Sequence, residues 1–225
     1  MKFTAIAFDL DGTLYPNSRL YIRLVPFVLK EHRLLRAMGK ARTLLRKEHL
    51  PEDSLQNGDF YDIQASLMGQ ILGQPADEVK KRTEKLIYRG WEPHFLKVRL
   101  FPHVKETLEA FRKAGLKLGL LSDFPPETKL KNLDIHEYWD AVLGSEQSGH
   151  IKPHSAPFLE LSKRLETAPK DILYVGNSIS YDVNGASKAG MKTALIHSKW
   201  KKRPKIDLSC FVFHDYRQLF DYVLS

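Results

Sequence analysis

An apolar run near the start of the chain ends in two carboxylates, and this arrangement limits the folds that the chain can adopt. Residues 3–8 have the length and composition of a buried strand. Asp9 and Asp11 follow directly, before Gly12 and Thr13. Two carboxylates this close repel each other unless a cation neutralises them, and Mg²⁺ suits oxygen ligands. The motif predicts a polar site at a strand end, although an Asp-Gly turn explains the motif alone equally well.

Two later segments also carry polar residues beside predicted elements. Ser122 and Asp123 follow the apolar run 116–121, and Lys152 stands before a proline where a loop is expected to lead into a helix. Alone, Ser122 would most often be an ordinary strand-end hydroxyl, and Lys152 a solvated surface charge. Their chemistry becomes informative only together with Asp9.

A fourth segment, residues 175–182, follows the apolar run 172–175 and contains Asn177 and Asp182. Small residues continue beyond it, and Gly190 is placed to end a helix in a left-handed conformation. In this order and at these separations, the four segments resemble the four motifs of the haloacid dehalogenase (HAD) superfamily of hydrolases. The resemblance covers roughly residues 1–200.

The resemblance implies a catalytic pair at the first motif, and the residue chemistry agrees. An Asp carboxylate can attack a phosphoryl group directly, which makes Asp9 the expected nucleophile. Asp11 lies two positions on, on the same face of an extended segment. It is expected to act as general acid for the leaving group and then as general base for water.

The same resemblance implies a phosphate site. Thr13 and Ser122 are suited to donate hydrogen bonds to phosphate oxygens, and Asp123 is included in the expected phosphate-binding set. Lys152 is expected to hold the phosphoryl group and the nucleophile together, so it counts as both catalytic and phosphate-binding.

The expected metal ligands for Mg²⁺ are Asp9, Asp11, Asn177 and Asp182, and one of them departs from the family pattern. The fourth motif usually begins Gly-Asp, whereas this chain has Gly176-Asn177. An amide oxygen can ligate Mg²⁺ but brings no charge, so we expect weaker metal binding. The metal-free dehalogenase branch lacks the second Asp of the first motif, whereas this chain keeps Asp11.

Between Leu14 and Phe101 the apolar residues recur at helical spacing. Residues 20–35 suggest one long helix, Leu44 and Leu45 belong to another, and two more are expected around residues 63–71 and 79–87. This insert matches the helical cap of the family's first subgroup. We therefore expect a helical cap over residues 16–98 and an α/β catalytic core over residues 1–15 and 99–225.

The rest of the chain alternates between strands and helices. Strands are expected at residues 3–8, 116–121, 141–143, 172–175, 193–196 and 211–213. This alternation predicts a Rossmann-like, doubly wound parallel sheet with helices on both faces and a site at the carboxyl ends of its strands. The fold class is thus α/β with an inserted all-helical cap.

Composition narrows the remaining possibilities. The 225 residues carry a formal charge of +8, and basic residues cluster in residues 33–47 and 199–205. These clusters are either solvated faces or a means of attracting anions, while the lack of a recognised motif disfavours nucleic acid. No apolar stretch reaches the length of a membrane helix, and we expect a cytoplasmic protein. Cys210 is the single cysteine and is expected to be a small buried hydrophobe.

The sequence therefore predicts a Mg²⁺-dependent phosphatase that hydrolyses a small phosphomonoester, from a metabolite or a nucleotide, through a phosphoaspartyl intermediate. Residues 14–16 resemble the pyrimidine 5′-nucleotidase branch, and the cap layout is similar to that of phosphoglycolate phosphatases. A non-catalytic binding or regulatory protein with this fold is one alternative, and a metal-free 2-haloacid dehalogenase is another. Neither the exact substrate nor the oligomeric state follows from the sequence.

Overall fold

The computed structural model describes residues 2–47, 59–95, 98–200, 202, 204–206 and 209–225. Its centre is a parallel sheet of six strands in the order β3-β2-β1-β4-β5-β6. The strands are β1 (Ala5–Phe8), β2 (Lys117–Ser122), β3 (Ala141–Gly144), β4 (Ile172–Gly176), β5 (Lys192–Ile196) and β6 (Phe211–Phe213). Each corresponds to a predicted strand, so the predicted α/β fold class is confirmed.

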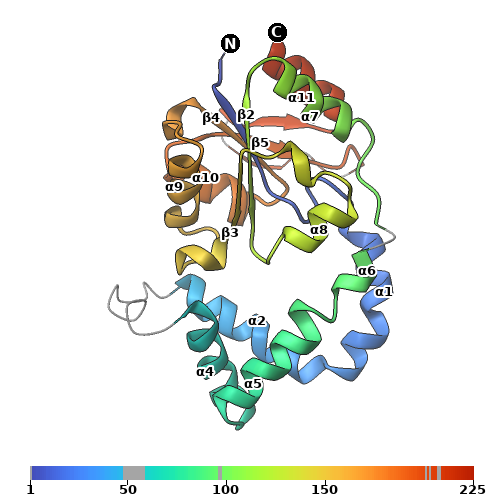
Figure 1. Ribbon diagram of the computed structural model, residues 1–225, viewed down its shortest axis with the longest axis vertical. Helices are drawn as coiled ribbons and strands as arrows, with labels where there is room; N and C mark the ends of the chain where they lie inside the picture. The colour runs from blue at the N-terminus through green and yellow to red at the C-terminus, as the bar shows by residue number, and fades with distance from the viewer. Residues whose placement is uncertain (1, 48–58, 96–97, 201, 203, 207–208) are drawn as a thin grey trace.

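Helices cover both faces of the sheet (Figure 1). On β1, Ile6 and Phe8 join the apolar cluster that contains α7 (Val104–Lys113) and α11 (Tyr216–Leu224). Ala5 and Ala7 face the opposite cluster, with α9 (Ser155–Arg164) and α10 (Asn184–Lys188). This alternation follows from the period of two in a strand. Both faces of β1 are therefore buried, as the continuous apolar run required.

Between β1 and α7 the chain forms helices that lie together at one end of the molecule (Figure 1). They are α1 (Asn17–Lys30), α2 (His32–Lys47), α4 (Phe60–Leu72), α5 (Ala76–Thr83), the π-helical turn η1 (Glu84–Tyr88) and α6 (Glu92–Phe95). Their position beyond the carboxyl ends of the strands is that of a cap. The domain limits 16–98 stay a prediction.

The remaining elements are short connections. They are α8 (Glu127–Asn132), η2 (His136–Tyr138), η3 (Ser145–Ser148), η4 (Pro169–Asp171) and η5 (Ile179–Val183). The helix α10 ends before Gly190, which has a φ of +84° as predicted for a left-handed helix end. Cys210 is buried, also as predicted. In the part of the chain that the structure describes, no helix has the length and apolarity needed to cross a bilayer.

The prediction of one long helix over residues 20–35 is wrong. The helix α1 ends at Lys30, because Glu31 leaves the helical conformation, with φ −108° and ψ 23°. The buried carboxylate of Glu31 accepts a hydrogen bond from Arg82 at 2.5 Å, which ties this corner to α5. Leu44 and Leu45 belong to the same helix, α2, as Leu34 and Leu35. Apolar periodicity continues across this corner and so could not reveal it.

Candidate active site

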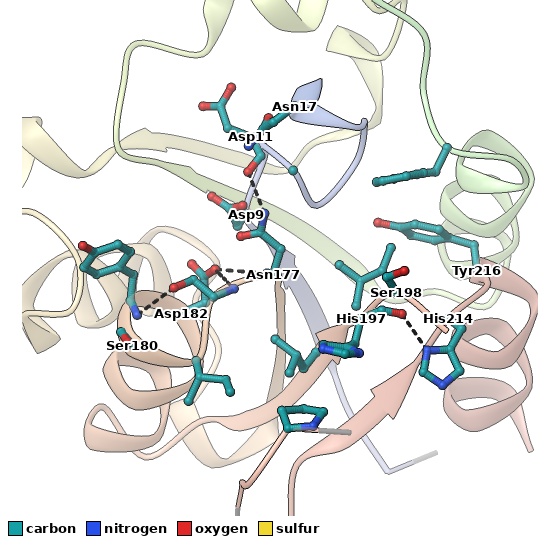
Figure 2. A pocket seen from close by; sticks show the side chains of 18 of the residues that line it. Asp9, Asp11, Asn17, Asn177, Ser180, Asp182, His197, Ser198, His214 and Tyr216 are labelled. Atoms are coloured by element: carbon teal, nitrogen blue, oxygen red, sulfur yellow. Dashed lines mark hydrogen bonds between the residues drawn. The ribbon is translucent and has the colours of Figure 1, made fainter. Parts of the chain in front are cut away.

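The predicted site residues gather at the carboxyl ends of three adjacent strands. Asp9 follows β1, Ser122 ends β2 and Asn177 follows β4. The backbone N–H of Asp9 donates to the carbonyl of Val175 at 2.9 Å, which fixes the first motif beside the fourth. Figure 2 shows Asp9, Asp11, Asn177 and Asp182 around one end of a cavity, with His197, His214 and Tyr216 at the other.

The carboxylate of Asp9 is buried and held at both oxygens. Its Oδ2 accepts from the hydroxyl of Thr13 at 2.6 Å, and its Oδ1 accepts from the ammonium of Lys152 at 2.7 Å. Burial raises the pKa of Asp9 from its ordinary value of 3.8 to about 7, against the opposing attraction of Lys152. Asp182 and Asp11 raise the same pKa further. The site therefore resists the charge that a nucleophilic carboxylate needs, and an added cation would relieve that resistance.

Lys152 bridges two carboxylates. Its Nζ also donates to Oδ1 of Asp182 at 2.8 Å and to the hydroxyl of Tyr174 at 3.4 Å. Burial alone would lower the pKa of Lys152, but the neighbouring Asp182 and Asp9 hold that pKa well above its ordinary value. Lys152 therefore carries its charge at any physiological pH.

Both oxygens of Asp182 already accept hydrogen bonds from the protein. Oδ1 binds Lys152, while Oδ2 accepts from the backbone N–H groups of Asn177 at 3.1 Å and Ser178 at 2.9 Å. Asp182 thus holds both the lysine and the loop of the fourth motif. Its predicted role as a direct metal ligand stays a prediction.

Asp11 has a partner that the sequence did not reveal. Lys129, from α8, donates to the two carboxylate oxygens of Asp11 at 2.8 and 2.7 Å. The hydroxyl of Ser122 lies 3.4 Å from the same carboxylate, and the hydroxyl of Tyr15 also donates to it. Lys129 is buried with its ammonium near the ring of Phe95, 4.9 Å from the ring centroid. Lys131 is the same residue type in the same helix, so only the phase of the helix distinguishes the two.

The amide of Asn177 lies beside the backbone of Asp11. Its Nδ2 donates to the main-chain carbonyl of Asp11 at 3.1 Å, in a space that a Cβ on Gly12 would fill. A half-turn of the amide would present Oδ1 to this space instead. Among the described residues no three His, Cys, Asp or Glu side chains group as a metal site. The oxygens of Asp9, Asp11 and Asn177 are of the type that a hard cation prefers, although they bring few formal charges, and their role as Mg²⁺ ligands stays a prediction.

Asp123 has contacts with the protein on both carboxylate oxygens. Its Oδ1 accepts from Ser145 Oγ at 2.7 Å and from the backbone N–H of Lys152 at 3.2 Å. Its Oδ2 accepts from Arg46 of the cap at 3.0 Å. Burial would raise the pKa of Asp123, but Lys152, Arg42 and Arg46 together hold that pKa below its ordinary value. The predicted contact of Asp123 with phosphate stays a prediction.

A cavity of about 1440 Å³ opens from these residues toward the cap. Core side chains form its floor, and Tyr21, Arg46 and Phe95 from the cap helices line it together with Trp91 from the turn before α6. The basic residues of α2 separate into two groups, since Arg42 and Arg46 turn inward whereas Arg33, Arg36, Lys40 and Lys47 are exposed. In the second basic cluster, Lys201 and Arg203 lie outside the described residues.

Comparison with known proteins identifies the class to which this site belongs. The model of haloacid dehalogenase-like hydrolases matches residues 6–196. The glyceraldehyde 3-phosphate phosphatase of Methanopyrus kandleri is 30% identical over 97% of this chain and 96% of its own length. The phosphoglycolate phosphatase of Escherichia coli is 31% identical over 91% of this chain and 85% of its own. The chain belongs to the haloacid dehalogenase-like hydrolase family, and the predicted class of enzyme, a phosphatase of this family, is confirmed.

Solved structures agree on the fold. A HAD phosphatase from Thermococcus onnurineus superposes with a TM-score of 0.65 at 23% identity, and 98% of each chain is covered. A 2-haloacid dehalogenase from Pseudomonas syringae gives a TM-score of 0.65 at 22% identity over the same shares. Because phosphatase and dehalogenase structures match equally well at this identity, they show the fold and do not separate the two chemistries.

Proposed function

We propose that this protein hydrolyses a small phosphomonoester in two steps, through a phosphoaspartyl intermediate on Asp9. The observation that carries the proposal is the placement of the Asp9 carboxylate. It is fixed by Thr13 and Lys152 at the end of β1 and lies at the floor of the cavity, with a second carboxylate, Asp11, two residues on. A held nucleophile beside a separate acid–base group is the arrangement that covalent phosphoryl transfer requires.

In the first step a carboxylate oxygen of Asp9 attacks phosphorus, and the bond from phosphorus to the leaving oxygen breaks. Asp11 gives a proton to that oxygen, so the product leaves as a neutral alcohol. In the second step Asp11 takes a proton from water, the water oxygen attacks phosphorus, and the acyl phosphate bond breaks to regenerate Asp9. Lys152 supplies positive charge to the phosphoryl oxygens. The hydroxyls of Thr13 and Ser122, which donate to Asp9 and Asp11 in this structure, would turn to donate to those oxygens when the substrate is bound.

We further propose that Mg²⁺ assists the reaction. The carboxylate of Asp9, the main-chain carbonyl of Asp11 and the amide oxygen of Asn177 would hold the ion. When bound, it would offset the electrostatic repulsion between the negative carboxylate of Asp9 and the negative phosphoryl oxygens. Lys129 supplies a positive charge on the other carboxylate of this site, Asp11, so part of the neutralisation comes from the protein itself.

The substrate class that we propose is a small phosphorylated metabolite. We also propose that the protein acts in the cytoplasm. The names of the two relatives above support it, since phosphoglycolate and glyceraldehyde 3-phosphate are both small phosphomonoesters. The mixture of aromatic and charged side chains around the cavity is compatible with a nucleotide as well. A panel of phosphomonoesters, assayed for phosphate release with Mg²⁺ present, would rank these substrates.

One assay pair tests the proposal against its two alternatives. Phosphate release from a generic aryl phosphate with added Mg²⁺ is expected, with no halide release from a 2-haloacid. Halide release without phosphate release would instead favour a dehalogenase. If neither product formed while phosphate or a phosphomonoester still bound, the binding-protein alternative would take its place.

A further inference from the structure

Two arginines of α2 reach from the cap into the core. Arg42 and Arg46 are four residues apart and therefore lie on one face of the helix. Arg42 forms an ion pair with Glu146 at 2.5 Å and donates to the main-chain carbonyl of Asp123 at 2.8 Å. Arg46 donates through Nε to the main-chain carbonyl of Lys152 at 2.9 Å and through Nη2 to the carboxylate of Asp123 at 3.0 Å. The cap thus contacts the backbone of a catalytic residue directly.

The backbone of Lys152 is held on both sides. Its N–H donates to Oδ1 of Asp123, and its C=O accepts from Arg46, which binds the other oxygen of the same Asp123 carboxylate. Asp123, Arg46 and Lys152 are therefore joined pairwise by three hydrogen bonds, which form a closed network. The side chain of Lys152 extends from this network to Asp9. A shift of the network would move the ammonium that holds the nucleophile.

The surroundings of the two arginines indicate a specific geometry. The guanidinium of Arg46 lies 4.4 Å from the ring centroid of Tyr181, and that of Arg42 lies 4.5 Å from the ring centroid of Phe124. A planar guanidinium that both stacks and donates in a fork cannot be replaced by a lysine without loss. Arg42 and Glu146 are almost fully buried, so the cost of desolvation offsets most of the attraction between them. If either side chain moved away, the other would be left as an unpaired buried charge, which is strongly unfavourable.

We propose that Arg46 is a positioning residue for Lys152, so that the phosphate-binding lysine is correctly placed only when the cap lies on the core. This inference deepens the proposed function and rests on it, because Lys152 must act on the phosphoryl group. It differs from a substrate contact by Arg46, which would favour particular leaving groups. Positioning through Lys152 affects every phosphomonoester alike.

The test compares Arg46→Ala and Arg46→Lys with Lys47→Ala, a change at the exposed next residue of α2. For Arg46→Ala we expect kcat/KM to fall by about 10- to 100-fold, by analogy with the loss seen when residues that orient the ligands of a metal ion are removed. The loss should be equal for an aryl phosphate and for phosphoglycolate. Guanidinium at a non-denaturing concentration should restore part of the activity of Arg46→Ala only. Arg46→Lys should lie between the wild type and Arg46→Ala.

Calorimetric binding of tungstate, an oxyanion that resembles phosphate, provides a readout independent of turnover. Arg46→Ala should weaken tungstate binding in the wild-type background and leave it unchanged in a Lys152→Ala background, because coupled residues are not additive. Equal weakening in both backgrounds, a loss confined to phosphoglycolate, or wild-type kinetics in Arg46→Ala would each overturn the inference. A wild-type protein that binds tungstate but releases no phosphate would instead overturn the proposed function, and the binding cycle would still decide the role of Arg46.

Discussion

The variant Asp9→Asn removes the proposed nucleophile and a buried negative charge in one change. In the folded protein, burial raises the pKa of Asp9 from 3.8 to about 7, although Lys152 opposes this rise. In the unfolded chain the carboxyl has its ordinary pKa. An asparagine resembles the protonated carboxyl in size and in its lack of charge. The variant therefore avoids the free-energy cost of ionising Asp9 inside the fold.

The sign of the effect follows from proton binding. The folded state binds the proton of Asp9 more tightly than the unfolded state does, so this stabilisation is complete below pH 3.8. It decreases as the pH rises and is lost once the pH passes about 7. The difference between the two pKa values, at about 1.36 kcal/mol for each unit, corresponds to a loss of at most roughly 4 kcal/mol in the free energy of unfolding. Asp9→Asn should thus be as stable as the wild type near pH 4 and more stable at pH 8.

Urea unfolding of the metal-free protein, measured with a chelator between pH 4 and pH 8, provides the assay. Asp221→Asn, a change at an exposed aspartate of α11, serves as the control and should show no such gain. Turnover by Asp9→Asn should be absent throughout, because an amide is a poor nucleophile. A variant that is less stable than the wild type at pH 8, or a difference that does not change with pH, would refute the reasoning.

Three further variants address the charges and the space around Asp11. Asn177→Asp adds one negative charge to the proposed Mg²⁺ site. The attraction between two opposite unit charges 4 Å apart is about 4 kcal/mol, and after the cost of desolvation we expect a net gain of about 1–2 kcal/mol in the free energy of Mg²⁺ binding. The half-saturating Mg²⁺ concentration for activity should fall by roughly ten- to thirtyfold. Lys129→Met removes one positive charge and should lower the same concentration while also reducing kcat, as Mg²⁺ titration of activity would show. Gly12→Ala should lower both stability and activity, because a Cβ there would lie 1.9 Å from the amide of Asn177. Gly115→Ala, at a similar positive φ with nothing within 4 Å, should lower stability alone in thermal unfolding.

The sequence predicted those features that depend on local patterns. A buried parallel strand is a continuous apolar run, so all six strands could be recognised within two residues of their ends. The first and fourth motifs follow adjacent strands, and for this reason Asp9 and Asn177 could be expected to lie together. Asp9 and Lys152 form the expected contact across a separation of 143 residues.

Features that depend on helix phase or on long-range contacts could not be predicted. Lys129 and Lys131 are equivalent in sequence, yet only Lys129 is buried against Asp11. The basic residues of α2 form one run in the sequence, and only the packing of the cap on the core selects Arg42 and Arg46 from it. The corner at Glu31 depends on Arg82, which is 51 residues away.

The most direct test of the proposed mechanism is to trap the covalent intermediate on Asp9. Wild-type protein would be mixed with a phosphomonoester labelled in its phosphoryl group, quenched in acid during turnover, and digested for mass spectrometry. We expect a phosphoryl group on the peptide that contains Asp9, removable by hydroxylamine as an acyl phosphate should be, and none in Asp9→Asn. Steady turnover with an unmodified Asp9 peptide, or a phosphoryl group on a different residue, would contradict the account.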